Sequence, residues 1–200
     1  IESIYRIDPL PKVSDFVMMT TTTSGRDADT DYGEEHVVLK ESADAMEIAV
    51  YFNERIIDIG LTNTTLKLPQ TTLNDLMMLV EGISHYIYIA HRARVEQPLK
   101  AIEMEFQADI DKFLSTIFLK PRLGINPQTL MSLNACRFSL RPGLSTVERR
   151  RYRRSTAMSA RYVDHLHSTY YTTGKISHML RELRTLFRSS WRQKHTLIRM

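Results

Sequence analysis

The feature that most constrains the fold is a long run of helical periodicity that begins near residue 72. From Leu73 to Arg92, apolar side chains recur every three to four residues and cover a broad face of the predicted helix. After a break at Pro98, the same periodicity predicts a second helix to about Leu119. A helix that is apolar over so much of its circumference belongs in the centre of a domain. The sequence therefore predicts a mainly α fold.

Other helices are predicted from their capping signals. Thr72–Asp75 has the character of a capping box at the start of the first long helix. Residues 126–138 follow an Asn-Pro start signal, and Ser145-Thr146-Val147-Glu148 is a capping box that begins a helix ending before Gly174. Ser177 is the expected N-cap of a last helix. Together these segments predict a helical bundle.

The N-terminal part has a different pattern. Residues 1–35 contain a polar, turn-rich stretch and are predicted to form an irregular or flexible arm. Val37–Leu39 and Met46–Phe52 are β-branched or aromatic and predict a small strand element, although the second segment also fits helical periodicity. A short helix is expected next, with Asn53 as its N-cap. We therefore expect a single mainly helical domain over residues 36–200, with a minor α+β character.

Charge is divided unequally along the chain. Residues 141–200 contain 14 Lys/Arg and 3 Asp/Glu, whereas residues 1–140 contain 13 Lys/Arg and 20 Asp/Glu. The net charge of +4 therefore hides two halves of opposite sign. Such a division predicts an acidic partner, docking of the two halves on each other, or both.

The basic charge is most concentrated in the helix predicted to begin after Ser145. With residues placed about 100° apart, its arginines surround the first two turns and leave only a narrow apolar stripe, which Tyr152 occupies. Cations near a helix N-terminus oppose the helix dipole and repel one another, so helix stability does not explain this placement. Guanidinium groups bind phosphates and carboxylates in a bidentate way, which indicates a partner of that chemistry. The arginines are Arg149, Arg150, Arg151, Arg153, Arg154 and Arg161.

Three interpretations of this basic helix are open at the level of sequence. The arginines form a solvated face or are neutralised by the acidic first half, they contact nucleic acid, or they bind an acidic protein surface in a larger assembly. No groove-reading motif is present, so nucleic acid would be held mainly through its phosphates. The leading hypothesis is a non-enzymatic interaction protein that binds a polyanion, and DNA or RNA is the first candidate for that polyanion. A subunit or adaptor of a protein complex is the alternative.

A polar stripe runs along the predicted central helix and includes Glu81 and His85. Antiparallel packing of the next helix would bring His85 near Glu105 or Asp109. These four residues are the candidates for an acid–base site or a metal site, and the sequence does not specify the metal. Such a site would give the protein an enzymatic function. The spacing Glu81-x-x-x-His85 departs from the Glu-x-x-His of di-iron bundles. A hydrogen-bonded structural network that sets helix register is the competing hypothesis.

Catalytic and cofactor motifs are not recognisable, so no cofactor is expected and an enzyme is the weaker hypothesis. The single cysteine, Cys136, excludes an internal disulfide and is expected to be a buried structural thiol, which suits a reducing cytoplasm. The most apolar stretch, Leu76 to Ala90, is interrupted by polar residues and falls short of the roughly 20 residues of a membrane span. We therefore expect a cytoplasmic protein without a transmembrane segment.

The segment Val80-Glu81-Gly82-Ile83-Ser84-His85-Tyr86, together with Glu103 to Phe113 and Leu183 to Phe187, resembles a family of uncharacterised proteobacterial proteins that are mainly helical. The resemblance covers about half of the chain and implies a bacterial origin. It implies no activity and transfers no catalytic role to Glu81 or His85.

Overall fold

The computed structural model describes residues 1–20, 35–42, 45–61, 70–123 and 145–198. In these residues the fold is mainly helical with one small sheet, as the sequence predicts. The elements, in chain order, are α1 (Glu2–Tyr5), a 3₁₀ helix (Val13–Phe16), β1 (Val17–Thr20), β2 (Glu35–Glu41), β3 (Met46–Asn53), α2 (Glu54–Leu61), α3 (Gln70–Arg94), α4 (Ala101–Leu123), α6 (Thr146–Leu166), a π-helical turn (His167–Tyr171), α7 (Ile176–Arg188) and α8 (Trp191–Ile198).

The sheet has the strand order β1-β3-β2, with β1 parallel and β2 antiparallel to the central strand β3. Val50 of β3 pairs with Val17 on one side and with Val37 on the other. Alternate residues of β3, Val50 and Phe52, are fully buried, because the period of two in a strand places them on one face. Both predicted strand segments are therefore confirmed, and Met46–Phe52 forms a strand and not the alternative helix.

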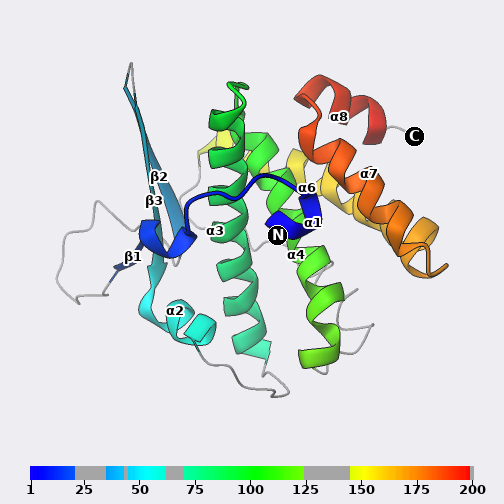
Figure 1. The fold of residues 1–200 in the computed structure, drawn as a ribbon, viewed down its shortest axis with the longest axis horizontal. Helices are drawn as coiled ribbons and strands as arrows, with labels where there is room; N and C mark the ends of the chain where they lie inside the picture. Colours follow the sequence, from blue (N-terminus) through cyan, green and yellow to red (C-terminus); the bar gives the residue numbers. More distant parts are fainter. Residues whose placement is uncertain (21–34, 43–44, 62–69, 124–144, 199–200) are drawn as a thin grey trace.

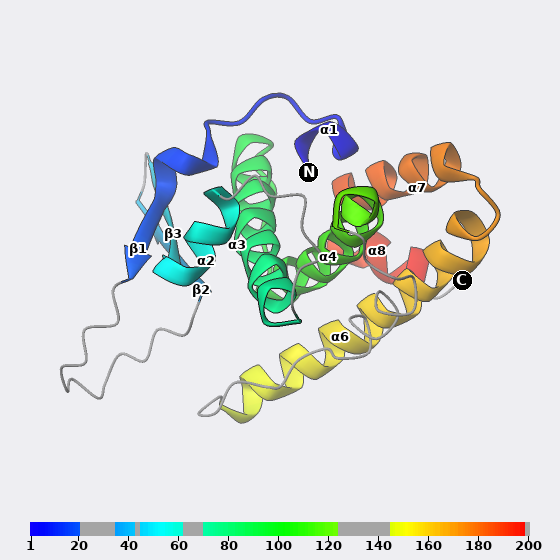
Figure 2. The ribbon, with the colours of Figure 1, turned by 90° about the horizontal axis from the view of Figure 1, so that it is seen from below.

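Helix α3 lies between two layers (Figure 1). The sheet and α2 pack on one side of it, α4 packs on the other, and α6 crosses the far side of α4 (Figure 2). Helices α7 and α8 close the end of the bundle beyond α4. This central position explains why α3 is apolar over so much of its surface. Fully buried side chains that join the layers include Phe52, Tyr88, Phe106, Ile110, Leu166, Leu183 and Phe187.

The start of α6 follows the predicted capping box. The side-chain oxygen of Ser145 accepts a hydrogen bond from the backbone N–H of Glu148 at 3.2 Å, and the Glu148 carboxylate accepts one from the backbone N–H of Ser145 at 2.8 Å. The helix continues into the π-helical turn, and Gly174 follows with a φ of 70°, a conformation that glycine adopts without strain. Both predicted boundary signals of this helix are confirmed.

The predicted irregular arm over residues 1–35 is wrong for residues 1–20. Tyr5 of α1 is fully buried and stacks on Phe187, with ring centres 4.2 Å apart. Strand β1 adds four residues to the sheet. These contacts join segments far apart in the chain, so local sequence patterns did not reveal them. Residues 21–34 of the predicted arm, and the helix predicted over 126–138 with Cys136, lie outside the described residues.

Several helix boundaries differ from prediction. Helix α3 begins at Gln70, ahead of the Thr72 signal, and α4 extends through Pro121 to Leu123. Helix α7 begins at Ile176 with Lys175 as its N-cap, so Ser177 lies within its first turn. Local start and stop signals are weak energetically, so they locate helix ends only to within a few residues.

Candidate functional site

The arginines of α6 are mostly on the solvent side of the helix. Arg149, Arg150, Arg153, Arg154 and Arg161 are exposed. Within the described ranges, Arg150, Arg153, Arg154 and Arg161 form no ion pair with an acidic side chain. We call these four residues the arginine surface. The first acid of α6, Glu148, is engaged in the capping box, and its hydrogen bonds with Ser145 lower the pKa of its carboxyl group.

The opposite face of α6 packs on α4 and is wider than the predicted stripe. Arg151 lies at its edge and is half-buried, with its guanidinium carbon 5.2 Å from the centre of the Tyr152 ring. It therefore contributes less to the basic face than the sequence predicts. The buried residues of this face are Ser155, Met158, Ser159, Tyr162, Val163 and Leu166.

Helix α8 borders the arginine surface. An Arg154 guanidinium nitrogen lies 3.4 Å from Nε2 of His195, and Arg192, one turn from His195, is exposed. Trp191 turns inward and meets the Phe106 ring edge-on at 6.1 Å, which anchors α8 on the core. The basic face thus continues from α6 onto an adjacent, anchored helix.

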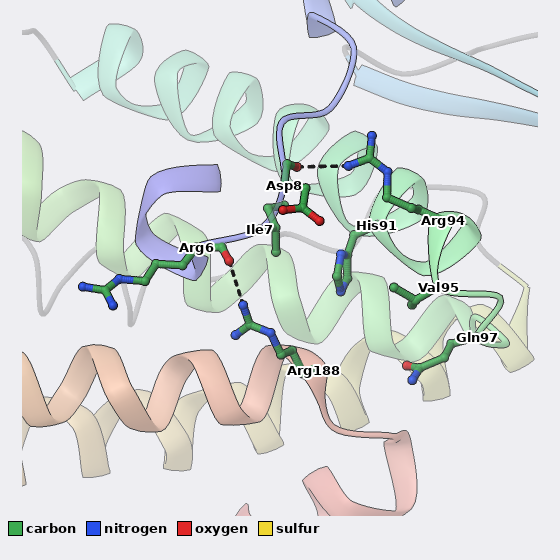
Figure 3. Close-up of a pocket in the computed structure, with 8 residues that line it drawn as sticks. All are labelled: Arg6, Ile7, Asp8, His91, Arg94, Val95, Gln97 and Arg188. Atoms are coloured by element: carbon green, nitrogen blue, oxygen red, sulfur yellow. Dashed lines mark hydrogen bonds between the residues drawn. The ribbon is translucent and has the colours of Figure 1, made fainter.

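Other arginines are engaged inside the molecule. Arg184 and Arg188 of α7 donate to the backbone carbonyls of Ile4, Tyr5 and Arg6 at 2.8–2.9 Å. Arg94 of α3 donates in the same way to Asp8 and Pro9. Figure 3 shows Arg94 and Arg188 directed at these carbonyls around a pocket of about 320 Å³. These side chains fasten the N-terminal segment, which distinguishes them from the arginine surface. The pocket is lined by Arg6, Ile7, Asp8, His91, Arg94, Val95, Gln97 and Arg188.

A second group of candidate residues lies buried between α3 and α4. The two helices run antiparallel, and Nε2 of His85 lies 4.0 Å from Oε2 of Glu105, so the expected approach of these residues is confirmed. One donor atom from each of Glu81, His85 and Glu105 lies within 4.8 Å of the other two. We call these three residues the Glu–His–Glu triad.

Asp109, the fourth residue predicted for this site, lies outside the triad and joins it through neighbouring side chains. Lys112 contacts Glu81 at 2.5 Å and Asp109 at 3.9 Å. Ser159 of α6 donates its hydroxyl to Asp109 at 2.5 Å. The cluster therefore connects three helices.

Sequence reasoning missed Glu35, the first residue of β2. This carboxylate is 4% exposed, and its Oε1 lies 3.5 Å from Nδ1 of His85. Gly82 makes the approach possible, because a Cβ there would lie 2.5 Å from the Phe52 ring and 3.1 Å from Oε1 of Glu35. A glycine in the interior of a predicted helix was the available signal, since such a residue often marks close packing.

The carboxylates dominate the electrostatics of the cluster. Burial alone would lower the pKa of His85, but Glu35, Glu105 and Glu81 together raise it to about 9. Burial raises the pKa of Glu105 to about 7, with Glu81 and Asp109 adding to the effect and His85 and Lys112 opposing it. Burial opposes the charge of Lys112, yet Glu81 and Asp109 raise its pKa. Both cations are thus held by surrounding negative charge.

Comparison with protein-family models, with curated proteins and with solved structures gives no match to this chain. Across the described segments, no helix combines the length and the hydrophobicity that crossing a bilayer requires.

Two further polar networks flank the triad in the core. Asp111 accepts hydrogen bonds from the hydroxyls of Tyr5 and Ser84, both at 2.5 Å. Arg92 pairs with Glu103 at 3.2 Å and shares Tyr88 with the buried Lys194. In the Asp111 network both carboxylate oxygens accept hydrogen bonds, which is typical of a structural role.

Proposed function

We propose that this protein is a non-enzymatic interaction protein whose arginine surface binds a polyanion, with nucleic acid as the ligand. One observation carries the proposal: four exposed arginines of α6 lack an acidic partner in the described part of the chain, whereas Arg94, Arg184 and Arg188 are engaged by carbonyls. Like charges three or four residues apart on a helix repel one another, as Arg150 and Arg154 do, so a ligand that neutralises them supplies a physical reason for the arrangement.

The spacing of the arginine surface suits a row of phosphates. Arg150, Arg154 and Arg161 share one side of α6 and extend over about 16 Å of its length. A DNA duplex of that length carries roughly ten phosphates. Arg153 lies beside the row, and Arg192 of α8 extends the exposed basic area. We expect binding through phosphates with little dependence on base sequence.

A fluorescence-anisotropy titration with labelled single-stranded and duplex oligonucleotides between 50 and 200 mM NaCl tests the proposal. Four phosphate contacts predict a slope of log K against log salt of about −3.6 for duplex DNA, which is a loss of roughly 100-fold over this range. Arg150→Glu combined with Arg154→Glu should weaken binding at least tenfold and make the slope shallower by about 2.

The matched control makes the same change of charge on α7. Lys175→Glu with Arg181→Glu replaces two other exposed cations and should leave most of the affinity intact. Equal losses in the two double variants would show unspecific attraction and contradict an interface on α6. Binding of polyglutamate, but of no oligonucleotide, would exclude nucleic acid and identify an acidic protein surface as the ligand.

A further inference from the structure

The buried triad contains a nitrogen that is left without a hydrogen bond. His85 is 6% exposed, and its Nε2 is fully buried with no hydrogen-bond partner among the described residues. This atom points towards Glu105, 4.0 Å away. Leaving a buried polar atom unsatisfied costs about 1–3 kcal/mol, so a network selected only for stability would be expected to satisfy it.

The other ring nitrogen of His85 lies near a carboxylate. Nδ1 faces Oε1 of Glu35 at 3.5 Å, from the sheet side of α3. A carboxylate on one imidazole nitrogen, with the second nitrogen open, is the arrangement that orients metal-binding histidines and increases their basicity. Glu35 would therefore support His85 without itself contacting the ion.

We propose that Glu81, His85 and Glu105 bind a single divalent transition-metal ion, with Glu35 as the positioning residue for the imidazole. Three atoms no more than 4.8 Å apart leave a central point within about 2.8 Å of each. Metal bonds to imidazole nitrogen and carboxylate oxygen are about 2.0–2.2 Å long, so each side chain needs to move inward by less than about 1 Å. One imidazole with two carboxylates suits Mn²⁺, Fe²⁺, Co²⁺ or Zn²⁺.

The charge of the cluster favours a cation. Among the described residues it holds four carboxylates, namely Glu35, Glu81, Glu105 and Asp109, against the two cations His85 and Lys112. Binding through Nε2 requires neutral imidazole, so the ion replaces a proton on His85. Lys112 competes for Glu81, which then offers its second oxygen to the ion while Lys112 remains near Asp109.

The test is direct titration of the full chain after removal of metals with a chelator. Calorimetry with MnCl₂, CoCl₂ and ZnCl₂, each alone, should show one equivalent bound with a Kd in the micromolar range or tighter for at least one ion. Co²⁺ should also give visible d–d absorption. His85→Ala and Glu105→Gln should each weaken binding at least 100-fold, and Glu35→Gln by 10- to 100-fold.

His91→Ala and Glu96→Gln are the matched controls, because they replace a histidine and a glutamate that lie outside the triad. They should leave the affinity unchanged. Glu105→Gln keeps the shape of the side chain and provides a folded variant if His85→Ala does not fold. The proposal is overturned if no ion binds stoichiometrically, or if binding survives both triad substitutions. Neither result bears on oligonucleotide binding by α6.

Discussion

Lys194 is fully buried in α8, and it has no carboxylate within ion-pair distance in the described residues. Its ammonium donates to the hydroxyl of Tyr88 at 2.7 Å and lies over the rings of Tyr88 and Phe106. Burial lowers the pKa of Lys194 to about 7, and the nearby charge of Arg92 adds to this effect. A lysine in such a position destabilises the fold whenever it carries its proton.

We expect the stability of the protein to rise with pH between about 7 and 10.5 because of Lys194. In that range the unfolded chain, with the ordinary pKa of 10.5, binds a proton that the folded protein has released. Lys194→Met removes this dependence and should stabilise the protein by about 1–4 kcal/mol at pH 6, since Tyr88 keeps its contacts with Arg92. Urea denaturation at pH 6 and pH 9 measures both effects. An unchanged pH dependence in the variant would contradict this account.

At the scale of elements, the approach of α3 to the sheet depends on Gly82. The ring of Phe52 and the carboxylate of Glu35 occupy the space where a side chain would be. The same close contact lies where β2 supplies Glu35 to His85.

Gly82→Ala should destabilise the protein, although alanine is the better helix former by about 1 kcal/mol. The new methyl group would meet the Phe52 ring at 2.5 Å, and overpacking of this kind costs about 1–3 kcal/mol. Thermal and urea denaturation give the net effect. Phe52→Leu should partly rescue Gly82→Ala in a double-mutant cycle, because it restores space at the same contact. A higher melting temperature for Gly82→Ala alone would contradict the close approach.

At this scale the sequence predicted which segments form helices better than it predicted where those helices begin and end. Periodicity and the Ser145 capping box act within a few residues, which is why α3, α4 and α6 could be identified. The start of α7 at Ile176 and the end of α4 at Leu123 were not predicted, because local signals for helix ends are weak and fix a boundary only to within a few residues.

At the scale of the whole molecule, the N-terminal segment joins both ends of the bundle. It runs from α1, beside α7, across to β1 in the sheet (Figure 2). The Tyr5 hydroxyl donates to Asp111 of α4, and arginines of α3 and α7 hold the carbonyls that follow. Much of the C-terminal basic charge on α7 is thus used to attach the beginning of the chain.

Tyr5→Phe should lower the free energy of unfolding by about 1–3 kcal/mol, because the Asp111 carboxylate loses a buried hydrogen bond while the ring remains packed. Tyr51→Phe is the matched control, since Tyr51 is half-buried and stacks on His36. Urea denaturation of the two variants checks the difference. Equal stability of Tyr5→Phe and wild type would show that the hydroxyl contributes nothing to docking.

Local interactions determined what the sequence alone could establish: the mainly helical fold, the two strand segments and the concentration of arginines along α6. Each depends on residues within one or two turns or on a strand's own composition. Only the tertiary structure decided that Glu35 reaches His85, that Tyr5 is buried, and which arginines are engaged. These contacts join residues as far as 183 positions apart, and spacing along the chain carries no information about them until the layers pack.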